Sequence, residues 1–405
     1  MEIELFDKKG NCCACGACMN ICPKGAIKMV EDVHGFLYPE INKELCVKCG
    51  ACKKVCAYQN KSPENRPLQA FAAVNKDKEQ LMKSASGGVF SAIATNVLNK
   101  GGIAFGATLL FEEGHAIPKH IAIDHVEQLP LLQGSKYVQS SIGDTYKQAK
   151  AFLQEGRLVL FSGTPCQIGG LYGYLGKDYE NLITVDVICH GVSNAKMFDD
   201  YLQNERIKRK AQSVIGYSFR DKKKGWGMNG RLDLRFADNK VKSFFIPARL
   251  ASYNTLFLDG DTYRENCYSC KYAGELRPAD LTIGDYWGIE VEHPELLKKE
   301  EYKEEFGISC ILANTSKGTA ICEELNNLIF DKSTFEKVSH RNGQLRFPSK
   351  LTERRQTILS IYSKYGYPKL DRWFLNNYKK QMFIHATYNA IPRNLRIKLK
   401  TLLKK

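Results

Sequence analysis

Long hydrophobic runs are missing from this 405-residue sequence, and no segment approaches the roughly 18 apolar residues of a membrane-spanning helix. The first ten residues hold three acidic residues, two lysines and no apolar stretch, so they do not resemble a secretory signal. The composition, 43% apolar and 25% charged, is that of a globular protein with room for a small domain and a larger one. We therefore expect a cytoplasmic protein.

Negative charge is scarce near the C-terminus. Residues 351–405 hold thirteen Lys or Arg but only Glu353 and Asp371, in a chain whose net charge is +15. A solvated basic helix packed on the body of the protein is the favoured interpretation, and residues 393–405 show leucines at near-helical spacing. Docking of an acidic partner protein and peripheral contact with an anionic membrane are the alternatives. No nucleic-acid-binding motif accompanies the charge, so no nucleic-acid partner is expected.

Cysteine, in contrast, is abundant, and nine of the fifteen residues fall between Cys12 and Cys56. Their spacing is C-x2-C-x2-C-x3-C, present twice and followed by Pro23 in the first copy and Ala57 in the second. In such runs three cysteines bind one 4Fe-4S cluster and the fourth crosses to the other cluster. The ligands predicted for the first cluster are Cys12, Cys15, Cys18 and Cys56, and those for the second are Cys46, Cys49, Cys52 and Cys22.

A pair of zinc sites is the alternative, although two interlocked sets of four thiolates are rare for zinc. The spacing leaves Cys13 without a partner, and it is interpreted as a bystander. Moving single electrons is the function that this module predicts.

The rest of the chain predicts a larger mixed α/β domain. Apolar runs at 70–74, 103–110, 158–161 and 182–188 resemble buried strands, and helix-like segments such as 89–99 lie between several of them. We predict an α+β or α/β fold with a ferredoxin-like domain at 1–60, a linker at 61–68, a flavin-binding domain at 69–345 and a basic helical extension at 346–405.

Four further cysteines form a second set, and two of them follow predicted strands directly, where sites are built in α/β folds. They are Cys166, Cys189, Cys267 and Cys270. A third 4Fe-4S cluster is the favoured interpretation, with zinc and separate buried thiols as alternatives. A catalytic thiol at Cys189 beside His190 is disfavoured because adjacent strand residues point to opposite faces.

Seven motifs in fixed order resemble the coenzyme F-420 hydrogenase/dehydrogenase beta-subunit family. After the ferredoxin module these are Ser84-Ala-Ser-Gly-Gly88, Gly134-Ser-Lys-Tyr-Val-Gln-Ser140, Gly163-Thr-Pro-Cys-Gln167, Cys189-His-Gly191, Cys267-x-x-Cys270 and Ile283-Gly-Asp-Tyr-Trp287. The resemblance covers residues 10–290. It implies an iron-sulfur flavoprotein oxidoreductase that passes electrons between clusters, an FAD and a deazaflavin-type or other reducible substrate.

The residues expected at the flavin lie in three of these motifs. Ser86 is a plausible N-cap of the helix at 89–99, where bare N–H groups accept a phosphate, and Lys136 offers positive charge to a reduced flavin. Plain helix capping and an exposed loop are the alternatives. The predicted FAD-binding residues are Ser84, Ser86, Gly87, Gly88, Ser135, Lys136, Tyr137, Gln139, Ser140 and Thr164; no catalytic residue is assigned.

The basic loop at 220–227 could clamp an acidic substrate or the FAD phosphates, but a solvated charge run is the favoured interpretation. The expected partners of the whole protein are an electron-transfer protein or partner oxidoreductase subunit, and a small-molecule electron carrier or substrate. A rival hypothesis is a non-catalytic, ferredoxin-like subunit that docks to a partner enzyme, and a weaker one is a zinc-stabilised binding protein.

Overall fold

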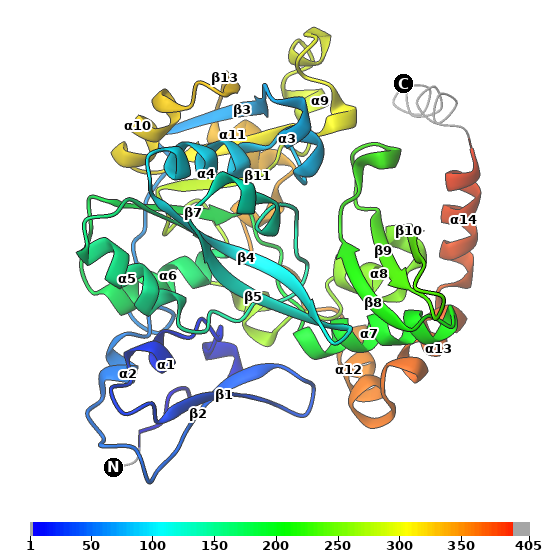
Figure 1. Cartoon of the computed structure of the whole chain (residues 1–405), viewed down its shortest axis with the longest axis horizontal. Helices are drawn as coiled ribbons and strands as arrows, with labels where there is room; N and C mark the ends of the chain where they lie inside the picture. The colour runs from blue at the N-terminus through cyan, green and yellow to red at the C-terminus, as the bar shows by residue number, and fades with distance from the viewer. Residues whose placement is uncertain (1–2, 392–405) are drawn as a thin grey trace.

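A computed structural model describes residues 3–391, which form three separate β-sheets and the helices around them (Figure 1). Within this described range, the search for a helix both long and apolar enough to span a membrane finds none. The predicted mixed α/β class is confirmed, with a ferredoxin-like module before a larger α/β body. The exact domain boundaries stay a prediction.

The N-terminal module contains little regular structure and is built around its doubled cysteine motif. Its two short helices each begin directly after a glycine with positive φ, Gly16 (77°) and Gly50 (74°), a conformation that side chains other than glycine rarely adopt. The motif repeat is therefore also a repeat of local structure. The elements are η1 (Lys9–Asn11), α1 (Ala17–Ile21), the antiparallel pair β1 (Ile27–Glu31) and β2 (Leu37–Ile41), and α2 (Ala51–Lys54).

An eight-stranded mixed sheet forms the centre of the body, in the order β13-β3-β12-β11-β7-β6-β4-β5. The four neighbours β11, β7, β6 and β4 are parallel, and the remaining pairs are antiparallel. Parallel strands place their carboxyl ends on one edge, which is where such sheets build sites. The strands are β3 (Gln69–Asn75), β4 (Ile103–Glu112), β5 (His115–Ile123), β6 (Val159–Gly163), β7 (Leu182–Val187), β11 (Leu281–Asp285), β12 (Ser309–Ala313) and β13 (Leu328–Ser333).

Helices cover both faces of this sheet because alternate strand residues point in opposite directions. Phe105 and Phe161 belong to a core cluster with α5 (Thr145–Gln154) and α6 (Pro165–Leu175). Their neighbours Ala104 and Leu160 belong to a different cluster with α4 and α10. The remaining helices of this part are α3 (Lys78–Lys83), α4 (Val89–Asn99), α9 (Ile289–Glu292), α10 (Ser316–Glu324) and α11 (Phe335–His340).

A second layer of structure lies beside the large sheet and carries most of the basic C-terminal extension (Figure 1). It packs a three-stranded antiparallel sheet and five helices around one aromatic core cluster centred on Phe198 and Tyr201. These elements are α7 (Ala195–Lys208), β8 (Ser213–Ser218), β9 (Gly230–Arg235), β10 (Val241–Ile246), α8 (Ser252–Leu258), α12 (Arg354–Tyr365), α13 (Tyr367–Asn377) and α14 (Lys379–Ala390).

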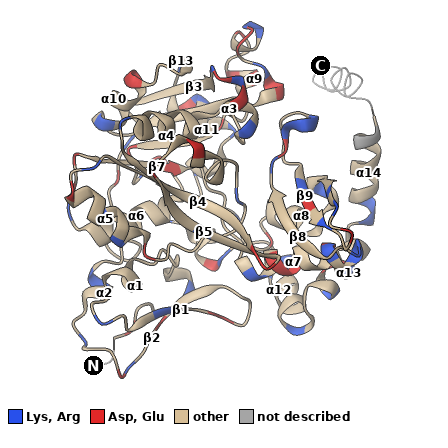
Figure 2. Cartoon of the chain, viewed as in Figure 1, with Lys and Arg blue, Asp and Glu red and all other residues tan. Residues whose placement is uncertain are grey.

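The prediction of a packed basic extension is confirmed for α12 and α13. Ile358, Leu370 and Phe374 are fully buried, and Asp371 accepts from Lys208 Nζ at 2.6 Å. The Lys and Arg residues along α12 to α14 (Figure 2) are exposed, apart from the half-buried Arg355. The leucine-spaced segment 393–405 lies outside the described residues.

The N-terminal module packs against one face of α6, and two glycines of that face, Gly170 and Gly173, meet the module. A Cβ atom on Gly170 would lie 2.7 Å from the Cys15 Sγ atom, and one on Gly173 would lie 2.2 Å from the Val55 backbone oxygen. Such separations are far below van der Waals contact. The absence of side chains at these positions therefore sets how closely the module approaches the body.

Replacing Gly173 by alanine is expected to loosen the module, because the new Cβ meets a backbone oxygen that cannot rotate away. Overpacking of this kind costs about 1–3 kcal/mol. Amide hydrogen exchange across residues 3–60 should accelerate in Gly173→Ala. Gly227→Ala is the control, since no atom lies within 4 Å of its Cβ position. Equal exchange in the two variants would contradict the close-packing account.

Candidate iron-sulfur and flavin site

The four thiols predicted for the first cluster lie together in the N-terminal module. Burial, and then the charges of Cys15, Cys12 and Cys56, raise the pKa of Cys18 well above its usual range. Burial likewise raises the pKa of Cys12 to about 11, with Cys15 and Cys56 contributing. Thiols influence one another in this way only when they are close neighbours.

The four thiols predicted for the second cluster line one small cavity in the module. Cys22, Cys46, Cys49 and Cys52 all contribute to its wall. Burial, and then charge on Cys49 and Cys22, raises the pKa of Cys52. Cys49 is exposed at the surface, so this cavity lies at the periphery of the protein.

The large-domain cysteines also converge, although they come from three segments spread over a hundred residues. Burial, and then charge on Cys267, Cys166 and Cys270, raises the pKa of Cys189 well above its usual range. Cys166 lies in the first turn of α6, Cys189 follows β7, and Cys267 and Cys270 lie in and after the 3-10 helix η5 (Glu265–Ser269). The structure thus brings all four predicted residues together.

These groups are spaced more widely than the ligands of one metal ion. In the described part of the chain, no three Cys, His, Asp or Glu side chains are grouped tightly enough to hold a single ion. A 4Fe-4S cluster binds its four thiolates at separate iron atoms, so its ligands stand farther apart than those of tetrahedral zinc. Each group supplies four cysteines, the number of thiolates that one 4Fe-4S cluster requires.

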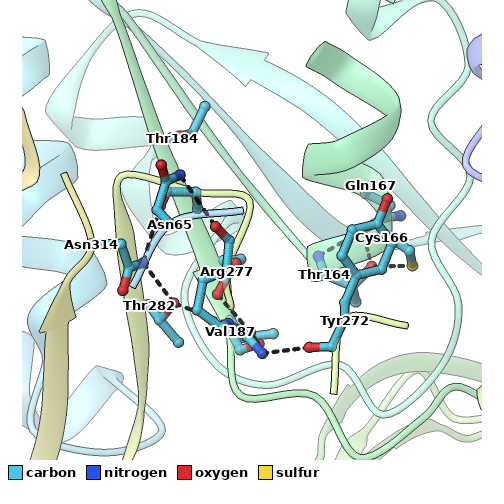
Figure 3. A network of polar contacts seen from close by, with 12 residues as sticks. Asn65, Thr164, Cys166, Gln167, Thr184, Val187, Tyr272, Arg277, Thr282 and Asn314 are labelled. Atoms are coloured by element: carbon cyan, nitrogen blue, oxygen red, sulfur yellow. Dashed lines mark hydrogen bonds and ion pairs between the residues drawn. The ribbon is translucent and has the colours of Figure 1, made fainter. Parts of the chain in front are cut away.

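A buried polar network holds the third group in place (Figure 3). Arg277 Nη2 donates to Asp186 Oδ1 at 2.7 Å and to the Val187 backbone oxygen at 3.1 Å, and Nη1 donates to the Tyr272 backbone oxygen at 2.8 Å. The guanidinium thereby ties the segment after Cys270 to the end of the strand that leads to Cys189. At α6, Thr164 forms a capping box with Gln167, and its hydroxyl lies 3.1 Å from Cys166 Sγ.

Cys13 links the first and third groups, which the sequence did not predict. Hydrogen bonds with Cys15 and Cys166 raise the pKa of Cys13, and its hydrogen bond lowers the pKa of Cys166 to about 7. Its side chain is 3% exposed. That Cys13 is a bystander and not a cluster ligand stays a prediction, but its thiol lies between a thiol of the module and a thiol of the body.

A cavity of about 460 Å³ adjoins the third group at the carboxyl edge of the large sheet. Cys166 and Cys189 belong both to that group and to the cavity wall. The volume lies within the range of about 300–1,000 Å³ that is usual for ligand sites. The other lining segments are 84–86, 88–91, 132–140, 162–164 and 187–192, with residues from 220 to 309 and Asn342 closing the far side.

Nine of the ten predicted flavin residues line this cavity, and Gly87 does not. These nine are Ser84, Ser86, Gly88, Ser135, Lys136, Tyr137, Gln139, Ser140 and Thr164. A Cβ on Gly87 would lie 2.3 Å from the Ala73 backbone oxygen, and its N–H donates to Ser309 Oγ. Gly87 is thus required for packing against β3 and β12.

Two details of the predicted flavin loop are corrected. The N-cap of α4 is Gly88, with φ of 81°, whereas the Ser86 hydroxyl donates to the Ile308 backbone oxygen at 3.0 Å. Lys136 Nζ donates to the Leu132 and Gln133 backbone oxygens, and burial lowers its pKa to about 7. The positive charge predicted at Lys136 is therefore only partly present at neutral pH.

The basic loop at 220–227 contains two buried residues, although the sequence predicted that the whole run is exposed to solvent. Arg220 is 8% exposed and pairs through Nη1 with Asp285 Oδ2 at 2.5 Å, and both residues line the cavity. Lys222 is 7% exposed and donates to the Leu81 and Ser86 backbone oxygens. The favoured interpretation of a solvated charge run is wrong for these two residues and holds for Lys223 and Lys224.

Three buried polar atoms at the cavity wall have no hydrogen-bond partner among the described residues. They are Arg220 Nη2, Asp285 Oδ1 and Gln133 Oε1. Burying such atoms without a partner is costly, so the wall is adapted to a polar ligand. One donor beside an acceptor fits the ring edge of a flavin, where carbonyl oxygens flank an N–H group.

Comparisons with known proteins identify two parts of the chain. Residues 156–332 match the family model that describes the C terminus of the coenzyme F420 hydrogenase/dehydrogenase beta subunit, and residues 11–60 match a 4Fe-4S dicluster domain. The two predicted 4Fe-4S clusters are thereby confirmed. No curated protein matches the chain significantly.

One solved structure with a similar chain is the F420-reducing [NiFe] hydrogenase complex from Methanosarcina barkeri. The likeness has 15% sequence identity and a TM-score of 0.41, and covers 78% of this chain and 94% of the matched chain. It is too distant to bear on fold or function.

Removing Arg277 is expected to destabilise the protein strongly, because Asp186 would then keep an unpaired charge in the interior. Both residues are almost fully buried, and breaking such a pair costs about 3–5 kcal/mol. The urea midpoint of Arg277→Leu should fall steeply and recover in part in the double variant with Asp186→Leu. Lys299→Leu, which removes an exposed pair with Asp331, should change stability by less than about 1 kcal/mol. Equal losses in the two single variants would contradict this account.

His120 is expected to make the protein acid-sensitive. Its Nε2 lies 3.0 Å from the Ser162 backbone oxygen and its Nδ1 lies 2.9 Å from Ser140 Oγ, and burial lowers its pKa to about 4. A histidine whose folded pKa is depressed stays neutral in the fold but protonates when unfolded, so stability is lost as the pH falls from 6.5 towards 4. Across this range the free energy of unfolding should fall by about 3 kcal/mol in the wild-type protein. In His120→Gln it should change much less with pH, and urea unfolding at several pH values measures both. Parallel pH profiles for the two proteins would exclude His120 as the cause.

Proposed function

Because the chain belongs to the coenzyme F420 hydrogenase/dehydrogenase beta-subunit family and binds two 4Fe-4S clusters, we propose that it is an iron-sulfur flavoprotein oxidoreductase. A third 4Fe-4S cluster is assigned to Cys166, Cys189, Cys267 and Cys270, and an FAD to the 460 Å³ cavity. When bound, the flavin joins two-electron chemistry with a substrate to the single-electron chemistry of the clusters.

One observation carries this proposal: Cys166 and Cys189 belong to the wall of the cavity and to the third cysteine group at once. A ligand in the cavity therefore lies next to the proposed cluster. Next to the third group, Cys13 contacts Cys15 of the first group. The second group includes Cys49, which is exposed at the protein surface. This order supports a path for electrons from the cavity to the surface.

The protein's own side chains have distinct roles in the proposed site. Arg220 and Asp285 supply a buried donor and a buried acceptor that orient the ring, and their mutual ion pair fixes both in position. Lys136 can hold or release a proton near pH 7, because burial lowers its pKa to about 7. The buried position of Tyr263 beside Gly191 closes the wall behind the Cys189 turn.

The substrate class that we propose is a deazaflavin-type or other reducible small molecule, and the family's description as a beta subunit supports a partner subunit. A docking subunit without a substrate site, the rival hypothesis, would not require a cavity lined by unpaired buried polar atoms. The cavity therefore favours the enzyme.

Substituting Cys166 by alanine tests the proposal. The wild-type chain is expected to hold about twelve iron atoms and one FAD, and Cys166→Ala about eight iron atoms with the ferredoxin clusters retained. Iron, sulfide and flavin should be quantified after anaerobic purification. Cys322→Ala is the matched control, because this cysteine is buried in α10 and belongs to none of the three groups.

Unchanged iron in Cys166→Ala would refute the third cluster. A wild-type protein without flavin would refute the FAD assignment and leave an iron-sulfur wiring protein.

A further inference from the structure

Arg264 is a fully buried cation at the junction of the N-terminal module and the body. Its exposure is 0%, and it is among the largest fully buried side chains of the protein. Its Nε donates to the Cys12 backbone oxygen at 3.0 Å, and its guanidinium lies 4.0 Å from the centre of the Tyr38 ring. Arg264 directly precedes η5, and its side chain extends from there into the cysteine loop of the module.

Arg264 has no carboxylate partner within the described chain, unlike the buried Arg220 and Arg277, which each pair with an aspartate. Gln139 Oε1 is its one side-chain acceptor among the described residues, at the long distance of 3.5 Å from Nη1. Its Nη2 has no partner in the same part of the chain. A buried charge without a counter-ion costs several kcal/mol, so an anion is required beside it.

Arg264 contacts cysteines that are predicted ligands of two different clusters. Its side chain contacts the first group through the Cys12 backbone oxygen, and its own backbone oxygen accepts from the N–H of Cys267 in the third group at 3.0 Å. The second group lines the small peripheral cavity of the module, and Arg264 is not part of the wall of that cavity. The cation is therefore positioned between two of the three sites and away from the other.

We propose that Arg264 is the shared counter-charge of the first and third clusters and raises the reduction potentials of both. The inference rests on the proposed function, since it concerns clusters bound by these thiolates. A cluster that gains an electron becomes more negative, so a fixed neighbouring cation stabilises the reduced form more than the oxidised form. One buried cation between two clusters shifts both potentials in the same direction, while the peripheral second cluster is tuned separately.

Three substitutions separate charge from shape. Arg264→Gln and Arg264→Met remove the charge, and Arg264→Lys keeps it. Each cluster's potential is measured by EPR-monitored redox titration of the full-length protein, with iron counted per chain. In the neutral variants the equilibrium constants for one-electron reduction of the first and third clusters should fall at least tenfold, which is about 59 mV, while the second is unchanged. Arg264→Lys should restore most of the difference.

Unchanged potentials in neutral variants that hold full iron would overturn the proposal, as would an equal shift of all three clusters. If the neutral variants lose the iron of the first and third clusters while Arg264→Lys retains it, the need for the charge is supported. Loss in all three variants overturns it, because the guanidinium shape would then be the requirement.

Failure of the proposed function gives a different result. Wild-type protein with about eight iron atoms would refute the third cluster alone. The first cluster would still be present, and its potential in Arg264→Gln would still decide the role of Arg264.

Discussion

The close contact between α6 and the N-terminal module is the constraint on which the arrangement of the cysteine groups depends. The first turn of α6 carries Cys166, and its glycine face admits Cys15 and the Val55 backbone. One helix therefore positions a cysteine of the third group and the approach of the module at the same time. A side chain at Gly170 or Gly173 would push the module away from α6 and so separate the first and third groups.

The second constraint is charge in a dry interior. Burial raises the pKa of Cys12, Cys189, Cys267 and Cys270, so these thiols must lose protons when they bind metal. The resulting negative charge requires buried cations, and Arg264 supplies one at the junction. Lys271, which is exposed, adds a second positive charge at this junction and donates to the Ala57 and Asn60 backbone oxygens of the module. Metal binding, module docking and these two cations are thus coupled.

The sequence predicted the module, the main strands and the three cysteine groups, because metal ligands and apolar runs have local spacing rules. It did not predict that Cys13 contacts Cys15 and Cys166, because a thiol without a place in the motif gives no signal until the fold is known. Arg220 and Asp285 were also missed as a pair: they lie 65 residues apart and only the fold joins them. The N-cap of α4 was placed two residues early, because the positive φ of Gly88 is not visible in a string of serines and glycines.

EPR spectroscopy of the fully reduced wild-type protein tests the central claim most directly, namely that three clusters lie along one path from the cavity to the surface. The account predicts about three spins per chain, with spectra broadened by magnetic interaction between neighbouring clusters. About two spins per chain, or three spectra without any interaction, would contradict the arrangement.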